Sequence, residues 1–410
     1  MQCSSKSKEK MLAGSAKRAG IGSRALLQWR SAALAIAVSA LLATPAYAVE
    51  LTSGDWTVDV GGIVNAYYTA TSCSGDAVGG PALAGKALGC SGENHKTTIG
   101  NGLLPSGLIT KFKTVQDGIE IGGTIGIMVH AATDSGIAAN SAVDVRQAFF
   151  TIGTAEAGTL KIGRDYGIFG ANAILGDMTL LGAGAPVQAT QRGRVTLGHI
   201  GAGYTYLDHY GQLTYTSPVL GGGFTFSGGV MSPVDTAPFV SKAYPQFQGQ
   251  LAWAGNGFKA WVGVKSQKFY GAGGSGGNFT ETAGEIGASY SGGPFGFLVN
   301  YQEGTGIGIL SDGDQGDVKG RNYLVQGSYN LTEKLKFGLN YGESRTKDDN
   351  HYNYLLNSSF KSNANATGGL YYKLTKSVTL VGEFGRTESK DYLGNTAKMW
   401  GGSLGGIVFF

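Results

Sequence analysis

Most of the chain alternates apolar with polar or small residues, which is the period-two pattern of a β-strand whose two faces meet different surroundings. In the segment KLKFGLNYGES, one face carries Leu335, Phe337, Leu339 and Tyr341. The same period recurs in PFGFLVNYQ and GFKAWVGVKSQ, and no stretch after residue 48 has the period of a long amphipathic helix. The pattern therefore predicts an all-β protein.

Sixteen segments follow this pattern, and the connections between them alternate between short turns, such as QDG and TAEA, and long loops rich in Gly, Ser, Asn and Asp. An even number of such strands, with short turns at one rim and long loops at the other, is typical of an outer-membrane β-barrel, which can cross a bilayer because closure pairs every backbone group. A secreted β-sandwich would also alternate, but its loops need not alternate in length. We therefore predict a 16-stranded antiparallel transmembrane β-barrel. Its strands are expected at roughly Asp55 to Ala70, Leu104 to Val115, Ile119 to His130, Val143 to Gly153, Gly158 to Arg164, His209 to Ser217, Gly222 to Ser232, Tyr244 to Ala254, Gly257 to Gln267, Thr280 to Ser291, Pro294 to Gly304, Arg321 to Leu331, Lys334 to Thr346, Asn363 to Leu374, Ser377 to Ser389, and Asn395 to Phe410.

The first 48 residues have the features of a secretory signal peptide. Basic residues precede an apolar run from Ser31 to Ala43, and the small-x-small pattern of a cleavage site ends at Ala48. The apolar run is shorter than the roughly 20 residues of a membrane-spanning helix. We expect residues 1–48 to be removed and residues 49–410 to form the barrel domain, with Met11 as an alternative start.

Removal of this segment changes the charge balance, because it holds seven Lys or Arg and one acid, so 25 basic and 27 acidic residues remain. A nucleic-acid partner, which a basic protein would suggest, then has no support. Cys73 and Cys90 are the two cysteines that remain, in the long insertion between the first two strands. Two cysteines are too few for a structural zinc site, and we predict that they form a disulfide, which could stabilise the fold by about 3 kcal/mol.

Three stretches resemble one protein family. The segment RQAFFTIGTAEAGTLKIGRDYGIFGAN, Arg146 to Asn172, is similar to the fourth and fifth strands of the general porins, the trimeric sixteen-stranded channels of Gram-negative bacteria, and to the start of their inward-folded third loop. LTYTSP, Leu213 to Pro218, resembles the strand and turn after that loop in the betaproteobacterial branch, and the terminal Phe410 resembles the assembly signal of the family. The resemblance implies a homotrimer in the outer membrane, among lipid and lipopolysaccharide. It further implies a water-filled pore for passive diffusion of small hydrophilic solutes and ions, without enzymatic activity or cofactor.

The resemblance also implies a pore constriction, where the third loop, about Asp165 to Leu207, faces basic residues of the wall. Carried over to this chain, the constriction comprises Lys111, Lys113, Arg146, Lys161, Arg164, Asp165 and Asp177. By alternation, Lys111 and Lys113 point inward if Leu108 and Phe112 face lipid. The same argument turns Arg146 inward, out of phase with Phe149, and Lys161 inward, opposite Leu160 and Ile162.

Five positive charges against Asp165 and Asp177 predict weak anion selectivity, because charged rings set the selectivity of pores. The alternative is that the inward acids Asp59, Glu120, Glu285 and Glu383 balance the wall. The family's arginine on the sixth strand is missing here, which argues against a full basic ladder.

Other candidate sites are weaker. Asp208 and His209 could activate water as a pair, but neighbouring residues on a strand point to opposite faces. A protease or lipase would need a serine with a base at a recognisable spacing, and the sequence has none. The segment SDGDQGD, with Asp312, Asp314 and Asp317, has a spacing that suits hard cations, yet it lacks a bidentate Glu and is more typical of a solvated loop. The second functional hypothesis is a structural or adhesive barrel whose outer loops bind a ligand while the third loop plugs the lumen.

Overall fold

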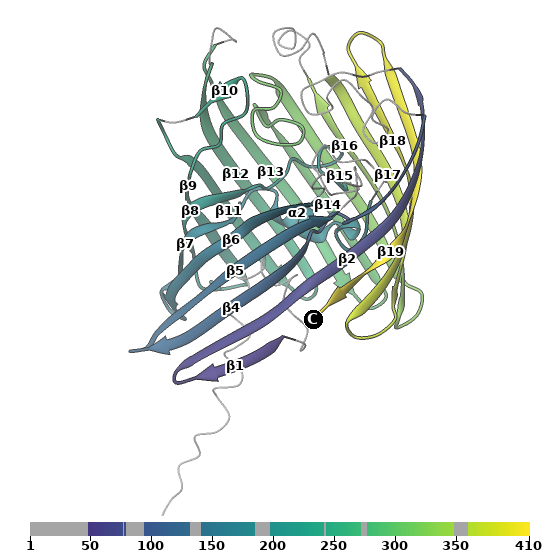
Figure 1. Cartoon of the computed structure of the whole chain (residues 1–410). Coiled ribbons are helices and arrows are strands. Elements are labelled where there is room, and N and C mark those ends of the chain that lie inside the picture. The colour runs from purple at the N-terminus through teal and green to yellow at the C-terminus, as the bar shows by residue number, and fades with distance from the viewer. Residues whose placement is uncertain are drawn as a thin grey trace, which may run out of the picture.

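The chain forms one closed antiparallel barrel in the computed structural model. The model describes residues 48–76, 78, 94–131, 141–184, 197–241, 243–271, 277–347 and 360–410. Within these ranges, nineteen strands form one sheet, and the last strand pairs with β2 to close it (Figure 1). Three of the nineteen, β1 (Val49–Ser53), β3 (His95–Gly100) and β10 (Phe239–Val240), are short, so the wall has sixteen strands. The predicted fold is confirmed.

The wall strands follow each other around the barrel in chain order, with β9 paired directly to β11. They are β2 (Trp56–Gly75), β4 (Ser106–Gln116), β5 (Ile119–Ala131), β6 (Ser141–Thr154), β7 (Gly158–Tyr166), β8 (His209–Thr216), β9 (Phe224–Met231), β11 (Gln246–Gly255), β12 (Phe258–Gly271), β13 (Phe279–Gly292), β14 (Phe295–Thr305), β15 (Lys319–Asn330), β16 (Leu335–Thr346), β17 (Phe360–Lys373), β18 (Val378–Asp391) and β19 (Thr396–Phe409). Every predicted strand has its counterpart. The largest boundary error is in β2, which continues to Gly75 because TSCSG is polar on both faces and lacks the alternation used to recognise strands.

The two faces of the wall differ as the alternation predicts. On β19, Trp400 and Leu404 point outward and are 48% and 69% exposed, whereas the inward Met399 and Ile407 are each 1% exposed. In a membrane protein the exposed apolar face is the face that meets lipid. Phe410 lies on this outer face, and its backbone exchanges hydrogen bonds of 2.7 and 3.1 Å with Gly62. The chain therefore ends as part of the sheet.

Among the described residues, one loop inside the barrel carries the helical structure. Residues 167–184 and 197–207 belong to the connection between β7 and β8, and they include the helix α2 (Ala171–Gly176) and the short 3₁₀-helix η3 (Met178–Leu181). Figure 1 shows α2 within the barrel, about halfway along the wall. This confirms the inward-folded third loop. No helix among the described residues is long and apolar enough to cross a membrane.

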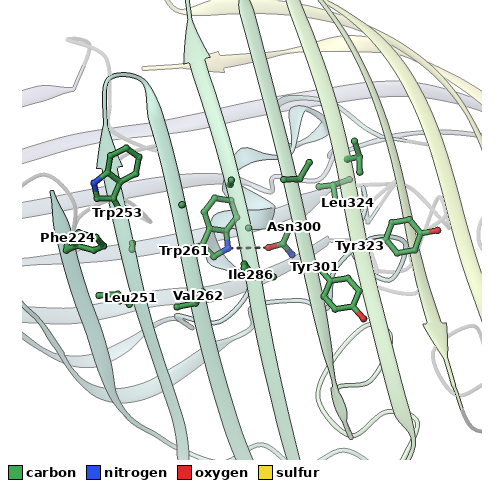
Figure 2. Close-up of a pocket in the computed structure, with 16 residues that line it drawn as sticks. Phe224, Leu251, Trp253, Trp261, Val262, Ile286, Asn300, Tyr301, Tyr323 and Leu324 are labelled. Atoms are coloured by element: carbon green, nitrogen blue, oxygen red, sulfur yellow. Dashed lines mark hydrogen bonds between the residues drawn. The ribbon is translucent and has the colours of Figure 1, made fainter. Parts of the chain in front are cut away.

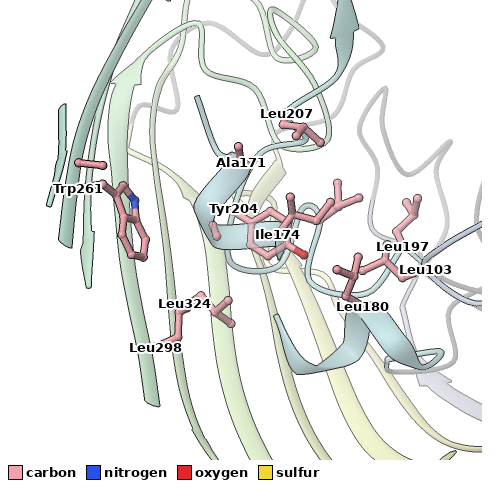
Figure 3. Close-up of a cluster of buried hydrophobic side chains, with 13 residues drawn as sticks. Leu103, Ala171, Ile174, Leu180, Leu197, Tyr204, Leu207, Trp261, Leu298 and Leu324 are labelled. Carbon is pink, nitrogen blue, oxygen red and sulfur yellow. The ribbon is translucent and has the colours of Figure 1, made fainter. Parts of the chain in front are cut away.

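The third loop packs on an apolar strip of the inner wall. Ala171, Ile174 and Leu180 of the loop belong to one buried cluster with the wall residues Trp261 and Leu324 (Figure 3). Apolar residues at lumen-facing positions would be unfavourable in open water, so this strip is explained by the loop that covers it. The alternating pattern of the strands predicts neither the strip nor its partner.

A second connection, residues 306–318 between β14 and β15, also packs inward. Asp312 is 1% exposed and forms a salt bridge with the buried Lys265 of β12, while the Tyr210 hydroxyl donates a hydrogen bond of 3.1 Å to it. Asp314 accepts hydrogen bonds from the N–H groups of Ile309 and Leu310, both at 2.7 Å, and burial raises the pKa of this carboxyl. The interpretation of SDGDQGD as a solvated loop is wrong for these two residues, because both carboxylates are buried and hydrogen-bonded inside the protein.

Candidate pore constriction

The start of the third loop is held by polar side chains of the wall strands β11 and β13. Gln248 Oε1 on β11 accepts hydrogen bonds from the N–H groups of Ile168 at 2.7 Å and Phe169 at 2.9 Å. Glu285 on β13 accepts one from Gly170 N–H at 3.1 Å. Buried backbone N–H groups outside regular structure need such acceptors, so these side chains fix the path of the loop.

The end of the described loop is held in the same way on β18. Glu383 Oε2 accepts hydrogen bonds from Ala183 N–H at 2.8 Å and Gly184 N–H at 2.6 Å, and its other oxygen accepts one from the Tyr371 hydroxyl at 2.6 Å. A Cβ atom at Gly182 would lie 2.3 Å from Oε1 of this carboxylate, so only glycine allows the loop to approach so closely. Glu285 and Glu383 are each 5% exposed. Both predicted inward acids are therefore anchors buried under the loop.

Asp177 does not face the basic wall residues. Its carboxylate caps η3 by accepting from Thr179 N–H at 2.9 Å, accepts from the Tyr204 hydroxyl at 2.7 Å, and lies 3.3 Å from Asn340 Nδ2 on β16. Burial beside this carboxylate keeps the pKa of Tyr204 well above its usual value, so the hydroxyl remains a donor. The expectation that Asp177 opposes the cluster around Arg146 is wrong, because its partners lie on the far side of the loop.

Lys111 and Lys113 on β4 point into the lumen, as alternation predicted. Both lie on the face that also carries the buried Ile109, while Leu108 on the other face is exposed. Lys111 is the cross-strand partner of Asp59 on β2, and Lys113 Nζ lies 3.9 Å from the same carboxylate. Two lysines thus share one acid.

Arg146 also points inward, but for a different reason from the one predicted. Phe149 faces the lumen, because its ring lies 5.0 Å from Lys161 Nζ, so strict alternation would have turned Arg146 outward. The pairing of β5 with β6 shifts register between Gly126 and Ile127 and leaves Arg146 without a partner. This β-bulge adds one residue to β6, so that Arg146 and Gln147 both turn inward.

The guanidinium of Arg146 is enclosed by side chains rather than open to the pore. Nε donates to Asp144 at 2.9 Å, NH2 lies 3.1 Å from His130 Nε2, and NH1 lies 3.4 Å from the Tyr206 hydroxyl. Sequence reasoning missed Asp144 as a partner, although it stands two residues before Arg146 on the same strand. With 5% exposure and a paired carboxylate, Arg146 adds less net charge to the pore than its formal charge suggests.

His209 extends this group of side chains. Its Nε2 lies 3.4 Å from Asp144 and its Nδ1 lies 3.1 Å from Asp208. The expectation that Asp208 and His209 point apart is wrong, because Asp208 precedes β8 and has a φ of 53°, outside strand geometry.

Lys161 and Asp165 on β7 form a salt bridge inside the barrel, and Asp165 also accepts from Gln147 Nε2 at 2.9 Å. Arg164 is different. It pairs across the sheet with the exposed Ala148, is itself exposed, and donates to the Val145 carbonyl at 3.0 Å. Arg164 therefore lies on the outer face of the wall, and counting it as a pore residue is wrong.

Cys73 lies near the end of β2 and is disulfide-bonded. Cys90 lies outside the described residues, so its pairing with Cys73 stays a prediction. Among the described residues, no group of three or more His, Cys, Asp or Glu side chains is placed to hold a metal ion.

A closed sixteen-stranded barrel with an apolar outer face and a folded-in loop defines an outer-membrane channel. The family model "Gram-negative porin" matches residues 32–392, and the chain belongs to this family. It is an outer-membrane channel for small solutes and not an enzyme.

Solved structures agree in fold. The outer membrane channel DcaP of Acinetobacter baumannii is 16% identical with a TM-score of 0.64, and the match covers 88% of this chain and 99% of that one. An anion-selective porin from Comamonas acidovorans is 18% identical with a TM-score of 0.60, covering 87% and 100%. OmpT of Vibrio cholerae, in its trimer form, is 14% identical with a TM-score of 0.55, covering 87% and 100%. A search of curated proteins finds no match.

Proposed function

We propose that this porin is weakly anion-selective. The observation that carries the proposal is a set of five inward lysines in the half of the barrel that bears the short turns: Lys111, Lys113, Lys161, Lys259 and Lys336. The inward carboxylates of the described strands that remain at least partly exposed in this half are Glu50, Asp59 and Glu120.

The other inward acids on this part of the wall contribute less to the field in the pore. Glu285 and Glu383 hold the third loop through hydrogen bonds, whereas Asp165 and Lys161 neutralise each other, so four of the five lysines contribute net positive charge. Lys259 contacts an amide oxygen of the loop, and Lys336 lies 4.9 Å from the ring centre of Tyr371, so neither is neutralised by these acids. A net positive lumen lowers the barrier for anions relative to cations.

Purified protein in a planar bilayer tests this proposal. Large stepwise conductances and a reversal potential of the sign for anions are expected in a salt gradient. A reversal potential of the opposite sign would show that the acids, including those in the loops, dominate the field. Silence at saturating protein would instead favour a barrel that the third loop plugs.

We also propose a homotrimer, the state that the OmpT structure displays. Gly62 and Ala66 on β2 face outward and would let neighbouring barrels approach closely, whereas Gly61 faces the lumen. Cross-linking in mild detergent should give a trimer band, and a monomer alone would contradict the proposal.

A further inference from the structure

Lys265 of β12 lies between two carboxylates inside the barrel. Asp312, on the inward connection between β14 and β15, forms a salt bridge with its ammonium group, and Glu281 Oε1 on β13 lies 3.2 Å from Nζ. The side chains of Lys265, Glu281 and Asp312 are 1%, 0% and 1% exposed. Among the ion pairs of the described residues, no other is so completely buried.

The register of neighbouring strands brings the lysine and Glu281 together. Trp261 and Lys265 lie on the inward face of β12, and Figure 2 shows the Trp261 indole directed toward Asn300, to which it donates a hydrogen bond of 3.2 Å. Glu281 is the cross-strand partner of Gln267, two residues beyond Lys265, so it occupies the diagonal position on the same face. The strand pairing therefore places an amine beside a carboxylate.

The carboxyl group of Asp312 is held by donors on one of its two oxygens. Oδ2 accepts a hydrogen bond of 3.1 Å from the Tyr210 hydroxyl and one of 2.8 Å from Gln246 Nε2, whereas Lys265 Nζ contacts Oδ1. If Nζ formed a bond to Cγ, negative charge would develop on Oδ2. Donors that already point at such an oxygen stabilise the tetrahedral intermediate of acyl transfer.

Glu281 is placed to carry protons in a site that excludes water. Neither of its oxygens has a hydrogen-bond partner among the described residues, which is unfavourable for a buried carboxylate and leaves both free to accept a proton. The ring of Phe169 lies 5.0 Å from Lys265 Nζ. Gly313 of the connection packs so closely on Phe269 that a Cβ atom would lie 2.8 Å from its ring.

We propose that Lys265 and Asp312 become joined by an amide bond that the chain forms in its own folded state. A proton passes from Nζ to Oδ1 within the salt bridge, and the neutral amine forms a bond to Cγ. Glu281 accepts a second proton from the nitrogen and returns it to the hydroxyl of Oδ1, so that the Cγ–Oδ1 bond breaks and one water leaves. No atom is oxidised or reduced. Groups fixed in this way reach effective concentrations of about 10⁵–10⁸ M, which favours a step that is slow between a separate amine and acid.

Lys161 and Asp165 provide a comparison within the same protein. They also form a salt bridge, but the lysine side chain is 19% exposed, and no salt bridge of the described residues joins it to a second carboxylate. The mechanism therefore predicts an amide at Lys265 and none at Lys161. The amide would fasten residues 306–318 to β12, and it does not depend on the proposed anion selectivity.

The test is a tryptic peptide map of the porin after purification from outer membranes and denaturation. An amide at Lys265 blocks cleavage there, so residues 260–268 should remain joined to residues 269–319 in a branched product that is lighter than the two peptides by one water. Fragment spectra should place the branch on Asp312, and trypsin should cut normally after Lys161. In freshly made Glu281→Gln protein, the branched product should fall by about tenfold or more, because a general base contributes about 10²–10⁴-fold in rate.

Three outcomes would overturn the proposal. Normal cleavage after Lys265 in wild-type protein would mean that the pair is a salt bridge only. A branch on Glu281 would mean that Asp312 is not the reacting carboxyl. Full yield in folded Glu281→Gln protein would exclude Glu281 as the proton carrier. The mobility of each variant on unheated gels identifies misfolded protein, and the wild-type map decides whether the bond exists even if a variant does not fold.

Discussion

Replacing Lys111 and Lys113 together with alanine should reverse the weak ion preference of the channel. The wall around the neck holds Lys111, Lys113, Arg146 and Lys161 against Asp59, Asp144 and Asp165, a formal balance of +1. The double substitution changes this balance to −1. Because neither lysine is buried, the barrel should assemble normally without them.

The size of the effect follows from Coulomb's law. A unit charge about 8 Å from a permeating ion contributes ~0.5 kcal/mol in water, and screening at 0.1 M salt reduces this to ~0.2 kcal/mol. Two lost charges act with opposite sign on anions and cations, so the permeability ratio should change by about 0.8 kcal/mol, or roughly fourfold. At 1 M salt the Debye length of about 3 Å should remove the shift.

The assay is the zero-current potential of single channels in a tenfold salt gradient. The matched control is Arg164→Ala/Lys268→Ala, which removes the same charge from the outer face and should leave the potential unchanged. An unaltered potential in the Lys111 and Lys113 variant would refute the assignment of selectivity to these lysines. An equal shift in the control would refute the outward placement of Arg164.

Three further results are expected. Asp312→Asn leaves the buried Lys265 with Glu281, 3.2 Å away, as its remaining carboxylate partner and should destabilise the barrel by about 1–3 kcal/mol, measured as a lower melting temperature, whereas no change would mean that the pair is not buried in solution. Glu383→Ala removes the acceptor of two loop N–H groups and should speed the uptake of larger neutral sugars in liposome swelling, while unchanged size exclusion would contradict its role as an anchor. Thiol alkylation without reductant should label neither Cys73 nor Cys90, and labelling of both would exclude the bridge.

The barrel itself was predictable from the sequence because its cause is local. Each strand needs only a period of two, and the contrast between lipid and lumen imposes that period on every segment, from β2 to β19. The inward direction of Lys111, Lys113 and Lys161 follows from the same rule. These predictions use no information about distant residues, and they agree with the structure.

The predictions failed where the inward or outward direction of a side chain depends on a break in the alternation of the strand. The bulge at Arg146 adds one residue to β6, and no local signal in the sequence reveals it. Arg146 was correctly predicted to point inward, but only because Phe149 was wrongly predicted to point outward. Arg164 was placed by its position at the start of the loop rather than by its phase on β7. Its phase relative to Leu160 and Ile162 would have placed it outside.

The sequence by itself determined the strands, their faces and the presence of a long third loop, because each depends on neighbours along the chain. The tertiary structure decided which charges remain in the pore. Glu285 and Glu383 became anchors, Asp177 turned to Tyr204, and Asp312 was buried against Lys265 only because the loops fold back across the lumen. Those contacts join residues far apart in the chain. The free energy of burying each carboxylate therefore depends on a partner that cannot be identified from the neighbouring sequence.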